Sequence, residues 1–548
     1  MLIDVFGIRV DLTGAKERAP SLHSTLDWGS PADAMLASLA SFLRRGLGNR
    51  VKAISILHPT SAPWPVSQER SSNLALIHVG LVHDPEHAFR LVDHGPTAAE
   101  EYQSATEEFH EFWGQKAELR RFKDGRITES VVWDVKTSDE RAHIPFLIVK
   151  HILNRHFGLA VEAVKTWQAQ FDSVLRLPAT ISRQVHSTPT TTGFKGALAA
   201  FDDLVRNLKA LGENIPLAIL SVTASSEYLR YTSVFTPIPA SPTTYMPMME
   251  IILEFEKSAK WPDDLRAIQK VKLAFFERIA AALMTSVAGL KATVVVGDGI
   301  YDSEIQDASR LEIVTPSGWA FSARTWNDRE ATLLDRILDK KAGILPHVTQ
   351  AHETDKKEHQ LALNARKIYT RRFIHGPRHH RAIASLCHRF PAYASTVRLL
   401  KRWLASHWLL RNHVSEEAVE LLCASCFIGS GRGLALSQSG SENIPGSKER
   451  GFALVVEFLK GWKWEGGLFI PLYGGAESNG GSVDALATSK GVGSNVSVWS
   501  ISTEVDEDGH VWTSHGPDLT AAHRIRALAK ATWEHLLDME NGTLDVKV

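Results

Sequence analysis

Two glutamates that follow an apolar segment are the first candidates for chemistry. Glu254 and Glu256 come after the run Met248–Leu253, and alternation along a strand places both carboxylates on one face. Nucleotidyltransferases hold two magnesium ions with carboxylates so spaced. Such a site also needs a third carboxylate on a neighbouring strand, for which Glu312 is the candidate, and a Gly-Ser turn that binds phosphate. The strand predicted at 216–222 runs into Thr-Ala-Ser-Ser-Glu, which has no glycine. We therefore expect a degenerate acidic pair, with no catalytic residue, metal or cofactor. The alternative is an active template-independent RNA nucleotidyltransferase that uses these glutamates and magnesium.

A basic segment is the second candidate. Between His359 and Ser415 there are eleven Lys and Arg, seven His and no acidic residue, in a chain of net charge −1. Helical spacing places Arg398, Lys401 and Arg402 on one face, and an apolar stripe on the other. The stripe consists of Val397, Leu400, Leu404 and Trp408. Further cations flank a turn at Gly376-Pro377: Arg371, Arg372, Arg378 and Arg381. The pattern predicts salt-dependent contact with RNA phosphates. The alternatives are a solvated helix face paired with acids of another domain, or a surface for a protein partner.

A second, smaller basic cluster lies on a predicted β-hairpin. Arg120, Arg121 and Lys123 precede Asp124-Gly125, a dipeptide suited to a tight turn between two strands. Arginines interleaved with an aromatic residue are typical of contact with single-stranded RNA. The alternative is a network of intramolecular salt bridges at a domain interface.

The composition indicates an ordinary folded protein. The chain has 548 residues, of which 44% are hydrophobic and 22% are charged, enough for several globular domains. Three cysteines cannot form a disulfide framework for this length, which favours a reducing compartment. Cys423 and Cys426 have the spacing of half a zinc site, but they fall in an apolar helix capped by Ser415, so we interpret them as core residues. No apolar run approaches the length of a membrane span, so we expect no membrane partner.

Two shifts in composition divide the chain. Residues 176–193 are rich in Ser, Thr and Pro, and residues 338–360 are polar and charged. The first region alternates helix and strand signals, the middle region combines both, and the last is mainly helical. The sequence thus predicts an α+β multidomain protein, with domains at 1–166, 167–350 and 351–548.

Several motifs resemble one known family. The stretch from Arg90 to Pro96, followed by residues 112–125 and 131–133, resembles the signature of the nucleolar RNA-associated protein (Nrap) family. Shorter matches lie at 229–235, 261–264, 397–403 and 511–513. The resemblance spans nearly the whole chain.

The resemblance implies a fold and a role. Members of this family are similar to two tandem class I CCA-adding enzymes, and they are structural subunits of the small-subunit processome in pre-rRNA processing. By this resemblance, the chain is a piece of a longer protein. It holds the α/β end of the first unit, then a nucleotidyltransferase-like domain, then a poly(A)-polymerase/OAS-like helical domain. The implied location is the nucleolus. The implied partners are pre-rRNA or snoRNA and other processome proteins, including the ribosomal RNA processing protein seven.

Overall fold

The computed structural model divides into two compact units. Unit 1 comprises residues 1–175, 386–504 and 508–548, and unit 2 comprises residues 176–385 and 505–507. The structure describes residues 6–13, 15, 31–57, 76–84, 86–97, 103–122, 125–135, 141–166, 174–175, 193–240, 248–258, 261–297, 304–339, 349–428, 444–473 and 497–544. The predicted domain boundaries lie near residues 166 and 350, whereas the two compact units divide near residues 175 and 385.

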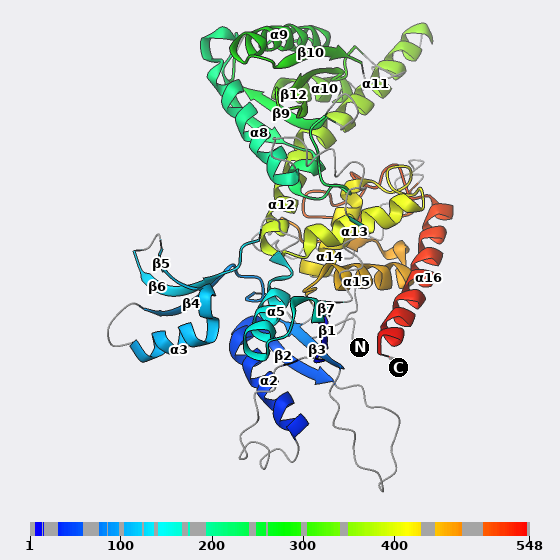
Figure 1. Cartoon of the computed structure of the whole chain (residues 1–548). Coiled ribbons are helices and arrows are strands. Elements are labelled where there is room, and N and C mark those ends of the chain that lie inside the picture. Colours follow the sequence, from blue (N-terminus) through cyan, green and yellow to red (C-terminus); the bar gives the residue numbers. More distant parts are fainter. Residues whose placement is uncertain are drawn as a thin grey trace. The chain divides into compact units, whose positions relative to one another are not determined.

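Unit 2 contains a five-stranded sheet in the order β10-β11-β12-β9-β8 (Figure 1). Its strands are β8 (Ile219–Ala224), β9 (Met249–Phe255), β10 (Lys291–Val296), β11 (Ser309–Val314) and β12 (Ala320–Trp326). Strands β9 and β12 are parallel, and the other neighbours are antiparallel. The unit's long helices are α8 (Gly193–Ala210), α9 (Leu265–Ser286), α10 (Asp328–Asp339) and α11 (Thr349–Tyr369).

The hydrophobic pattern of β9 explains its central place. Ile251 and Leu253 are fully buried, and Ile252 on the opposite face is also buried, as expected for a strand covered on both sides. Helix α9 begins after Asp264, whose side chain accepts a hydrogen bond from the backbone N–H of Ala267.

Helix α11 joins the core of unit 2 although its first half is polar. Ala362, Ala365 and Tyr369 are buried within the same hydrophobic cluster as the sheet. A π-helical turn, Thr370–His375, follows and leads into α12 (Gly376–Arg389). The polar composition near residue 350 therefore marks the start of a helix that packs on this sheet, which is why the compact unit extends to residue 385.

The N-terminal part of unit 1 contains two antiparallel sheets. The first has the order β2-β3-β1-β7 and is covered by two helices. Its elements are β1 (Phe6–Asp11), α2 (Pro31–Leu47), β2 (Val51–Leu57), β3 (Leu76–His83), α5 (Ile144–Phe157) and β7 (Val164–Thr166). The second has the order β4-β6-β5, and helix α3 packs on it. Its elements are β4 (Val92–Thr97), α3 (Gln103–Trp113), β5 (Ala117–Arg121) and β6 (Ile127–Val132).

The β-hairpin predicted around Gly125 is confirmed. Strands β5 and β6 pair with Arg121 opposite Ile127, and Gly125 has a φ of +86°. A glycine adopts this left-handed conformation without the steric cost that a side chain would add.

The C-terminal part of unit 1 is mainly helical. It contains α13 (Tyr393–Ser406), α14 (Glu416–Ile428), α15 (Lys448–Gly461), β13 (Leu468–Phe469), β14 (Ile501–Ser502) and α16 (Leu519–Leu544). Short 3₁₀ turns along the described chain lie at Gly48–Arg50, Gly114–Lys116, Val161–Ala163, Gly212–Asn214, Glu227–Arg230 and Trp464–Gly466.

Ser415 caps α14 as predicted, and its hydroxyl accepts a hydrogen bond from the Ala418 N–H. Cys423 is buried in that helix, and its burial raises the pKa of the thiol. Within the described ranges, no helix is long and apolar enough to cross a membrane.

Candidate functional site

The pairing of β8 with β9 decides which end of β9 could form a nucleotide site. The two strands are antiparallel, with Ala224 opposite Ile251 and Ser221 opposite Glu254. The turn that follows β8 therefore lies beside the start of β9, where the Ser225 N–H donates to the Glu250 carbonyl at 3.0 Å. Glu254 and Glu256 lie at the other end of β9. The predicted acidic pair thus lies at the end of β9 that is farther from the turn after β8.

The register also keeps the predicted third acid away from this pair. Glu312 on β11 is opposite Ser322 on β12, which in turn is opposite Glu250. Its carboxylate accepts a hydrogen bond from Arg310 at 2.9 Å. Glu254 instead accepts from the Ser221 hydroxyl at 2.7 Å. The structure therefore does not gather the three predicted glutamates, and no group of three or more His, Cys, Asp or Glu within the described ranges is arranged to hold a metal ion.

Two of the positions beside the turn carry residues that cannot bind a metal. Glu250 and Ile252 share one face of β9, and Arg324 lies opposite Ile252 on the parallel strand β12. Arg324 pairs with Glu250 at 3.3 Å and with Asp307 at 3.4 Å. A two-metal site would need carboxylates at neighbouring positions here, but a buried hydrocarbon and a guanidinium occupy them.

A second arginine reaches the same carboxylates from the π-helical turn. Arg372 pairs with Asp307 at 3.1 Å and with Glu250 at 3.7 Å. It also donates to the Asp307 carbonyl at 3.0 Å. Arg372, predicted to contact RNA, is therefore part of this internal network. Sequence reasoning missed Asp307 and Arg324, because no spacing rule relates them to residue 250.

The network extends into the core through Lys272 on α9. Its ammonium, fully buried, lies 2.9 Å from Asp307 and 2.7 Å from Glu330. Burial disfavours ionisation of Asp307, but Lys272, Arg372 and Arg324 outweigh it and hold the pKa of this carboxyl below its usual value. Burial raises the pKa of Glu330, although Lys272 opposes the shift. We call the six side chains the charge network of unit 2; three are cations and three are carboxylates: Glu250, Lys272, Asp307, Arg324, Glu330 and Arg372.

Other parts of unit 2 pack against the turn that follows β8. Ser226 caps the 3₁₀ turn Glu227–Arg230, and the buried Arg230 side chain donates to the Ser225 carbonyl at 2.6 Å. Gly376, at the start of α12, lies against the same turn: a Cβ added to it would be 3.0 Å from the Ser225 hydroxyl. Protein atoms therefore pack against this turn, where a Gly-Ser turn would bind a nucleotide's phosphates.

The basic face predicted on α13 is wrong for two of its three residues. Lys401 is fully buried, and its ammonium lies 2.8 Å from Glu416 and 2.7 Å from Glu420 on α14. Arg398 is also buried, and it donates to the Leu175 carbonyl at 3.4 Å. Arg402 is half-buried. The acids that pair with Lys401 lie just beyond the basic segment. The segment taken alone therefore predicted, wrongly, that the Lys401 side chain is exposed. Neither the RNA contact nor the solvated helix face describes Lys401: its side chain is buried rather than solvated, and the acids that pair with it lie on the next helix of the same part of unit 1.

The opposite stripe of α13 contains one exception. Val397, Leu400 and Leu404 are buried as predicted, but Trp408 is 78% exposed. It follows the helix end at Ser406 and lies in a turn.

Helix α12 presents three exposed cations of the basic segment. Arg378 and Arg381 are exposed, whereas His379, His380 and Ile383 on the other side are buried. The last turn of α12 adds Arg389, which is exposed and lies over the ring of Phe390. Arg371, in the preceding π-helical turn, is half-buried.

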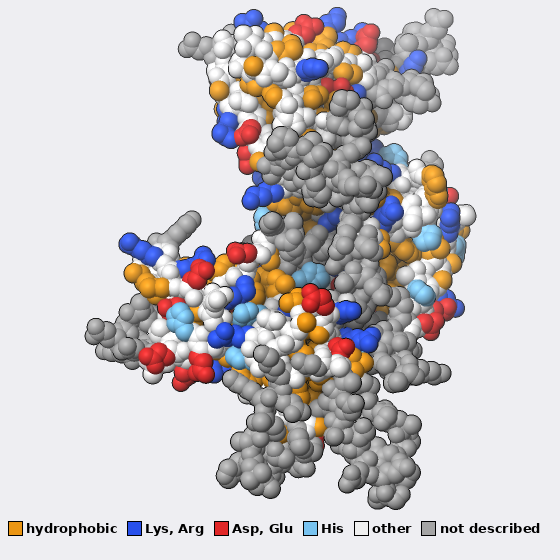
Figure 2. Space-filling view, viewed as in Figure 1, with side chains coloured by type: hydrophobic (Ala, Val, Ile, Leu, Met, Phe, Trp, Pro, Cys, Tyr) orange, Lys and Arg blue, Asp and Glu red, His pale blue; other side chains and the backbone are white. Residues whose placement is uncertain are grey.

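The hairpin presents a second exposed basic group. Arg120 and Arg121 are exposed on β5, and Arg120 pairs with Glu118 at 2.6 Å. Lys123 lies outside the described residues. Figure 2 shows Lys and Arg side chains near the free end of this hairpin, beside exposed hydrophobic side chains. Leu119 on β5 is also exposed.

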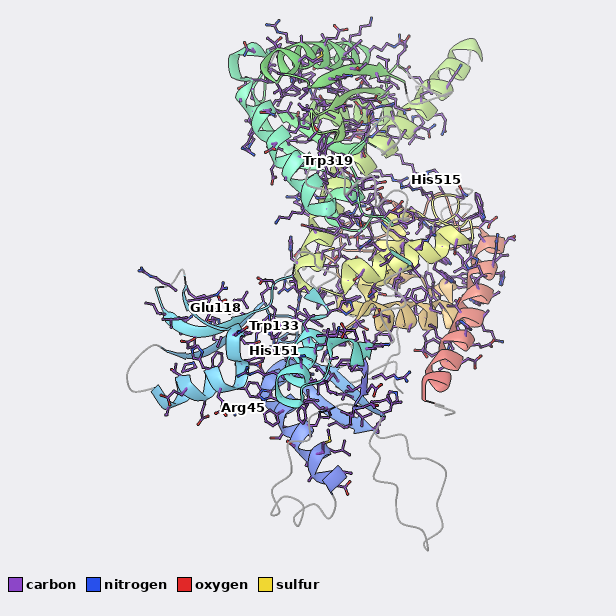
Figure 3. The ribbon with its side chains drawn as sticks, viewed as in Figure 1. Arg45, Glu118, Trp133, His151, Trp319 and His515 are labelled. Carbon is purple, nitrogen blue, oxygen red and sulfur yellow. The ribbon has the colours of Figure 1, made fainter. Side chains whose placement is uncertain are left out.

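The part of the family signature around Asp93 serves the core, whereas its residues on the β5–β6 hairpin are exposed. Asp93 accepts two hydrogen bonds from the buried Arg50, at 3.2 and 2.9 Å, one from Arg90 at 2.8 Å and one from the Trp133 indole at 3.0 Å. The Trp133 ring meets His151 edge-on at 6.3 Å, whereas Glu118 lies apart on the hairpin (Figure 3). The motif thus joins strand β4 to the residue after β6, which is reason enough for its specific sequence.

Comparison with family models identifies the domains. Residues 4–158 match "Nrap protein domain 3", residues 170–388 match "Nrap protein nucleotidyltransferase domain 4", and residues 390–548 match "Nrap protein PAP/OAS1-like domain 5". The chain belongs to the Nrap family. The predicted fold class is confirmed: an α/β domain, a nucleotidyltransferase-like domain and a PAP/OAS1-like helical domain follow one another.

Curated relatives agree with this assignment. The chain is 32% identical over 530 residues to "U3 small nucleolar RNA-associated protein 22" of Schizosaccharomyces pombe, a match that covers 94% of this chain and 44% of the relative. It is 28% identical to the Saccharomyces cerevisiae protein of the same name, over 78% of this chain and 33% of the relative. It is 27% identical to "Nucleolar protein 6" of Xenopus laevis, over 98% of this chain and 45% of the relative. The chain spans less than half the length of these relatives.

One solved structure is also similar. It is "Terminal uridylyl transferase 4 from Trypanosoma brucei with bound UPU", which matches 67% of this chain and 94% of its own at 10% identity, with a TM-score of 0.30. At this score the likeness supports no comparison of individual residues.

Proposed function

We propose that this chain is a non-catalytic, nucleotidyltransferase-like scaffold that acts in nucleolar pre-rRNA processing and small-subunit ribosome biogenesis. The family assignment supports this role, as do relatives named for U3 small nucleolar RNA and for the nucleolus. The proposed partners are pre-rRNA or snoRNA and other processome proteins, among them the ribosomal RNA processing protein seven.

The charge network of unit 2 is the observation that carries the non-catalytic part of the proposal. Magnesium ions require carboxylates whose oxygens are open to the metal. Here Glu250 and Asp307 are paired with Arg324 and Arg372, and the next residue after Glu250 on the same face of β9 is Ile252. The two guanidinium groups supply the positive charge that metal ions would supply in an active enzyme. They are covalently part of the fold, so the network holds its shape without a ligand.

The exposed cations support the RNA-contacting part of the proposal. Arg378 and Arg381 lie on the outer face of α12, and Arg120 and Arg121 lie on the β5–β6 hairpin. Exposed arginines bind phosphate oxygens through charge-assisted hydrogen bonds, and each phosphate contact adds to the salt dependence of affinity. Arg398 and Lys401 are no longer candidates, because their side chains are buried.

The test is RNA binding across a salt series by the whole chain. We compare the wild type with the double variant Arg378→Glu, Arg381→Glu. The matched control is Lys195→Glu, Lys209→Glu, which reverses two exposed charges on α8 of the same unit. We expect the α12 variant to bind more weakly and its slope of log K against log salt to fall by about 2, against little change for the control. Equal affinity and slope in all three proteins would exclude α12 as a phosphate-binding surface.

A parallel measurement tests the enzyme alternative. Magnesium and ATP are added to the wild type and to Glu254→Ala, and nucleotide binding is measured by calorimetry. The scaffold proposal predicts no magnesium-dependent binding in either protein. Saturable binding that is lost in Glu254→Ala would overturn the proposal and favour an active nucleotidyltransferase.

A further inference from the structure

The turn between α13 and α14 presents an aromatic ring in an unusual way. Trp408 is 78% exposed and has a φ of +61°, and Arg411, three residues on, has a φ of +66°. Residues other than glycine rarely adopt this left-handed conformation, and the surrounding structure must hold them in it. Two such residues within four positions mark this turn as a feature that the fold specifies.

Backbone hydrogen bonds hold the turn from within. Leu409 N–H donates to the Leu404 carbonyl at 2.9 Å, His413 N–H to the Leu409 carbonyl at 3.0 Å, and Arg411 N–H to the Val414 carbonyl at 2.8 Å.

Neighbouring segments anchor the same turn from outside. The Ser415 hydroxyl donates to the Trp512 carbonyl at 2.6 Å, and Gly516 packs directly on the backbone of His413. Arg411 pairs with Glu416 at 2.6 Å, which fixes it to the start of α14. The Trp408 ring is therefore presented on a rigid support, so that little conformational freedom is lost when a ligand covers it.

The surroundings of the ring favour a nucleic acid base over a protein pocket. Among the described residues of the C-terminal part of unit 1, the large hydrophobic side chains found exposed are Trp408 and Leu519, whereas protein interfaces gather several apolar anchors. The neighbours of Trp408 along the turn are His407, His413 and Arg411, and the charge of Arg411 is paired with Glu416. An exposed aromatic ring on a polar surface is one arrangement by which proteins bind single-stranded RNA, the ring stacking on a base.

We propose that Trp408 stacks on an unpaired base of single-stranded RNA. This inference rests on the proposed function and deepens it, because it names a base contact in addition to the phosphate contacts of α12. The indole ring is uncharged, so stacking should raise the affinity for RNA without changing the slope of log K against log salt.

The experiment measures binding of two labelled oligonucleotides of equal length, about 12 nucleotides. One is oligouridylate, and the other has the same backbone with abasic sites. We expect Trp408→Ala to weaken binding of oligouridylate by about 5- to 150-fold, the range for one lost stacking contact, with the salt slope unchanged. Trp408→Phe, which keeps a ring, should retain much of the affinity. On the abasic probe, wild type and Trp408→Ala should be equal.

Controls separate this inference from the proposed function. Leu519→Ala removes another exposed apolar side chain from unit 1 and should leave both affinities unchanged. Thermal melting checks that each variant is folded. If the double variant Arg378→Glu, Arg381→Glu reduces binding while Trp408→Ala does not, base stacking on Trp408 is excluded. The proposal that α12 contacts RNA is then retained. An equal loss by Trp408→Ala on both probes also excludes stacking. A wild type that binds neither probe overturns both proposals.

Discussion

Replacing Lys401 by methionine removes the cation that lies between Glu416 and Glu420. The wild-type ammonium is fully buried and contacts both carboxylates, at 2.8 and 2.7 Å. Methionine has similar length and fills the same space, so the change removes a charge and little volume. The remaining carboxylates then face each other inside the fold, and Glu416 loses Lys401 while it keeps its ion pair with Arg411.

The expected loss is large because a buried charge is left without its partner. Removing one member of a buried ion pair costs about 3 to 5 kcal/mol, against a total stability of about 5 to 15 kcal/mol for a folded protein. In the wild type, burial opposes ionisation of Glu416 but Lys401 and Arg411 hold its pKa below the usual value. Without Lys401 the pKa of these carboxyls rises above that of the unfolded chain. The penalty is then present above the raised pKa and is relieved as pH falls through it.

The assay is urea unfolding followed by tryptophan fluorescence, at neutral and at mildly acidic pH. We expect Lys401→Met to lower the free energy of unfolding by about 3 to 5 kcal/mol at neutral pH, and by less at lower pH. Lys401→Met, Glu420→Gln should recover part of the loss. Arg381→Met, an exposed change, should cost within about 0.5 kcal/mol. A stable Lys401→Met protein that binds RNA more weakly would refute the reasoning, since it would show that Lys401 is an exposed RNA contact.

Two further predictions concern unit 1. Asp93→Asn leaves the buried Arg50 without its carboxylate and should lower the free energy of unfolding by about 3 to 5 kcal/mol. The control Asp134→Asn, at an exposed position, should have little effect. Thermal melting of both variants checks this prediction. Burial lowers the pKa of His83 to about 4, so the unfolded chain takes up a proton below about pH 6.5 while the folded chain does not. Stability should therefore fall by up to about 3 kcal/mol as pH drops from about 6.5 to about 4, and His83→Asn should lack this part of the pH dependence; a protein whose pH profile is unaltered by the substitution would exclude a buried neutral His83.

Local patterns allowed most elements to be predicted from the sequence. The hairpin around Gly125 depends on neighbours in the chain, because a glycine that tolerates positive φ connects its two short strands. The capping of α14 by Ser415 is local in the same way. Such features are fixed within a few residues, and the three-dimensional structure adds only their exact ends.

The site residues were harder, because their partners are distant in the sequence. Arg372 is paired with Asp307, 65 residues earlier, and Lys401 with Glu420, 19 residues later. A helical wheel separates two faces of a helix but does not show what covers either face. The absence of acids between residues 359 and 415 made the segment look exposed, whereas four of its cations pair with carboxylates outside it: Arg366, Arg372, Lys401 and Arg411.

The same long-range pairing balances the charges beside the sheet of unit 2. In an active site, carboxylates of like charge are held close together, and metal ions or substrate relieve their repulsion. Here Lys272, Arg324 and Arg372 relieve the repulsion among Glu250, Asp307 and Glu330 from within the chain. A buried network with balanced charge penalises any rearrangement that separates its members, because each would be left desolvated and unpaired.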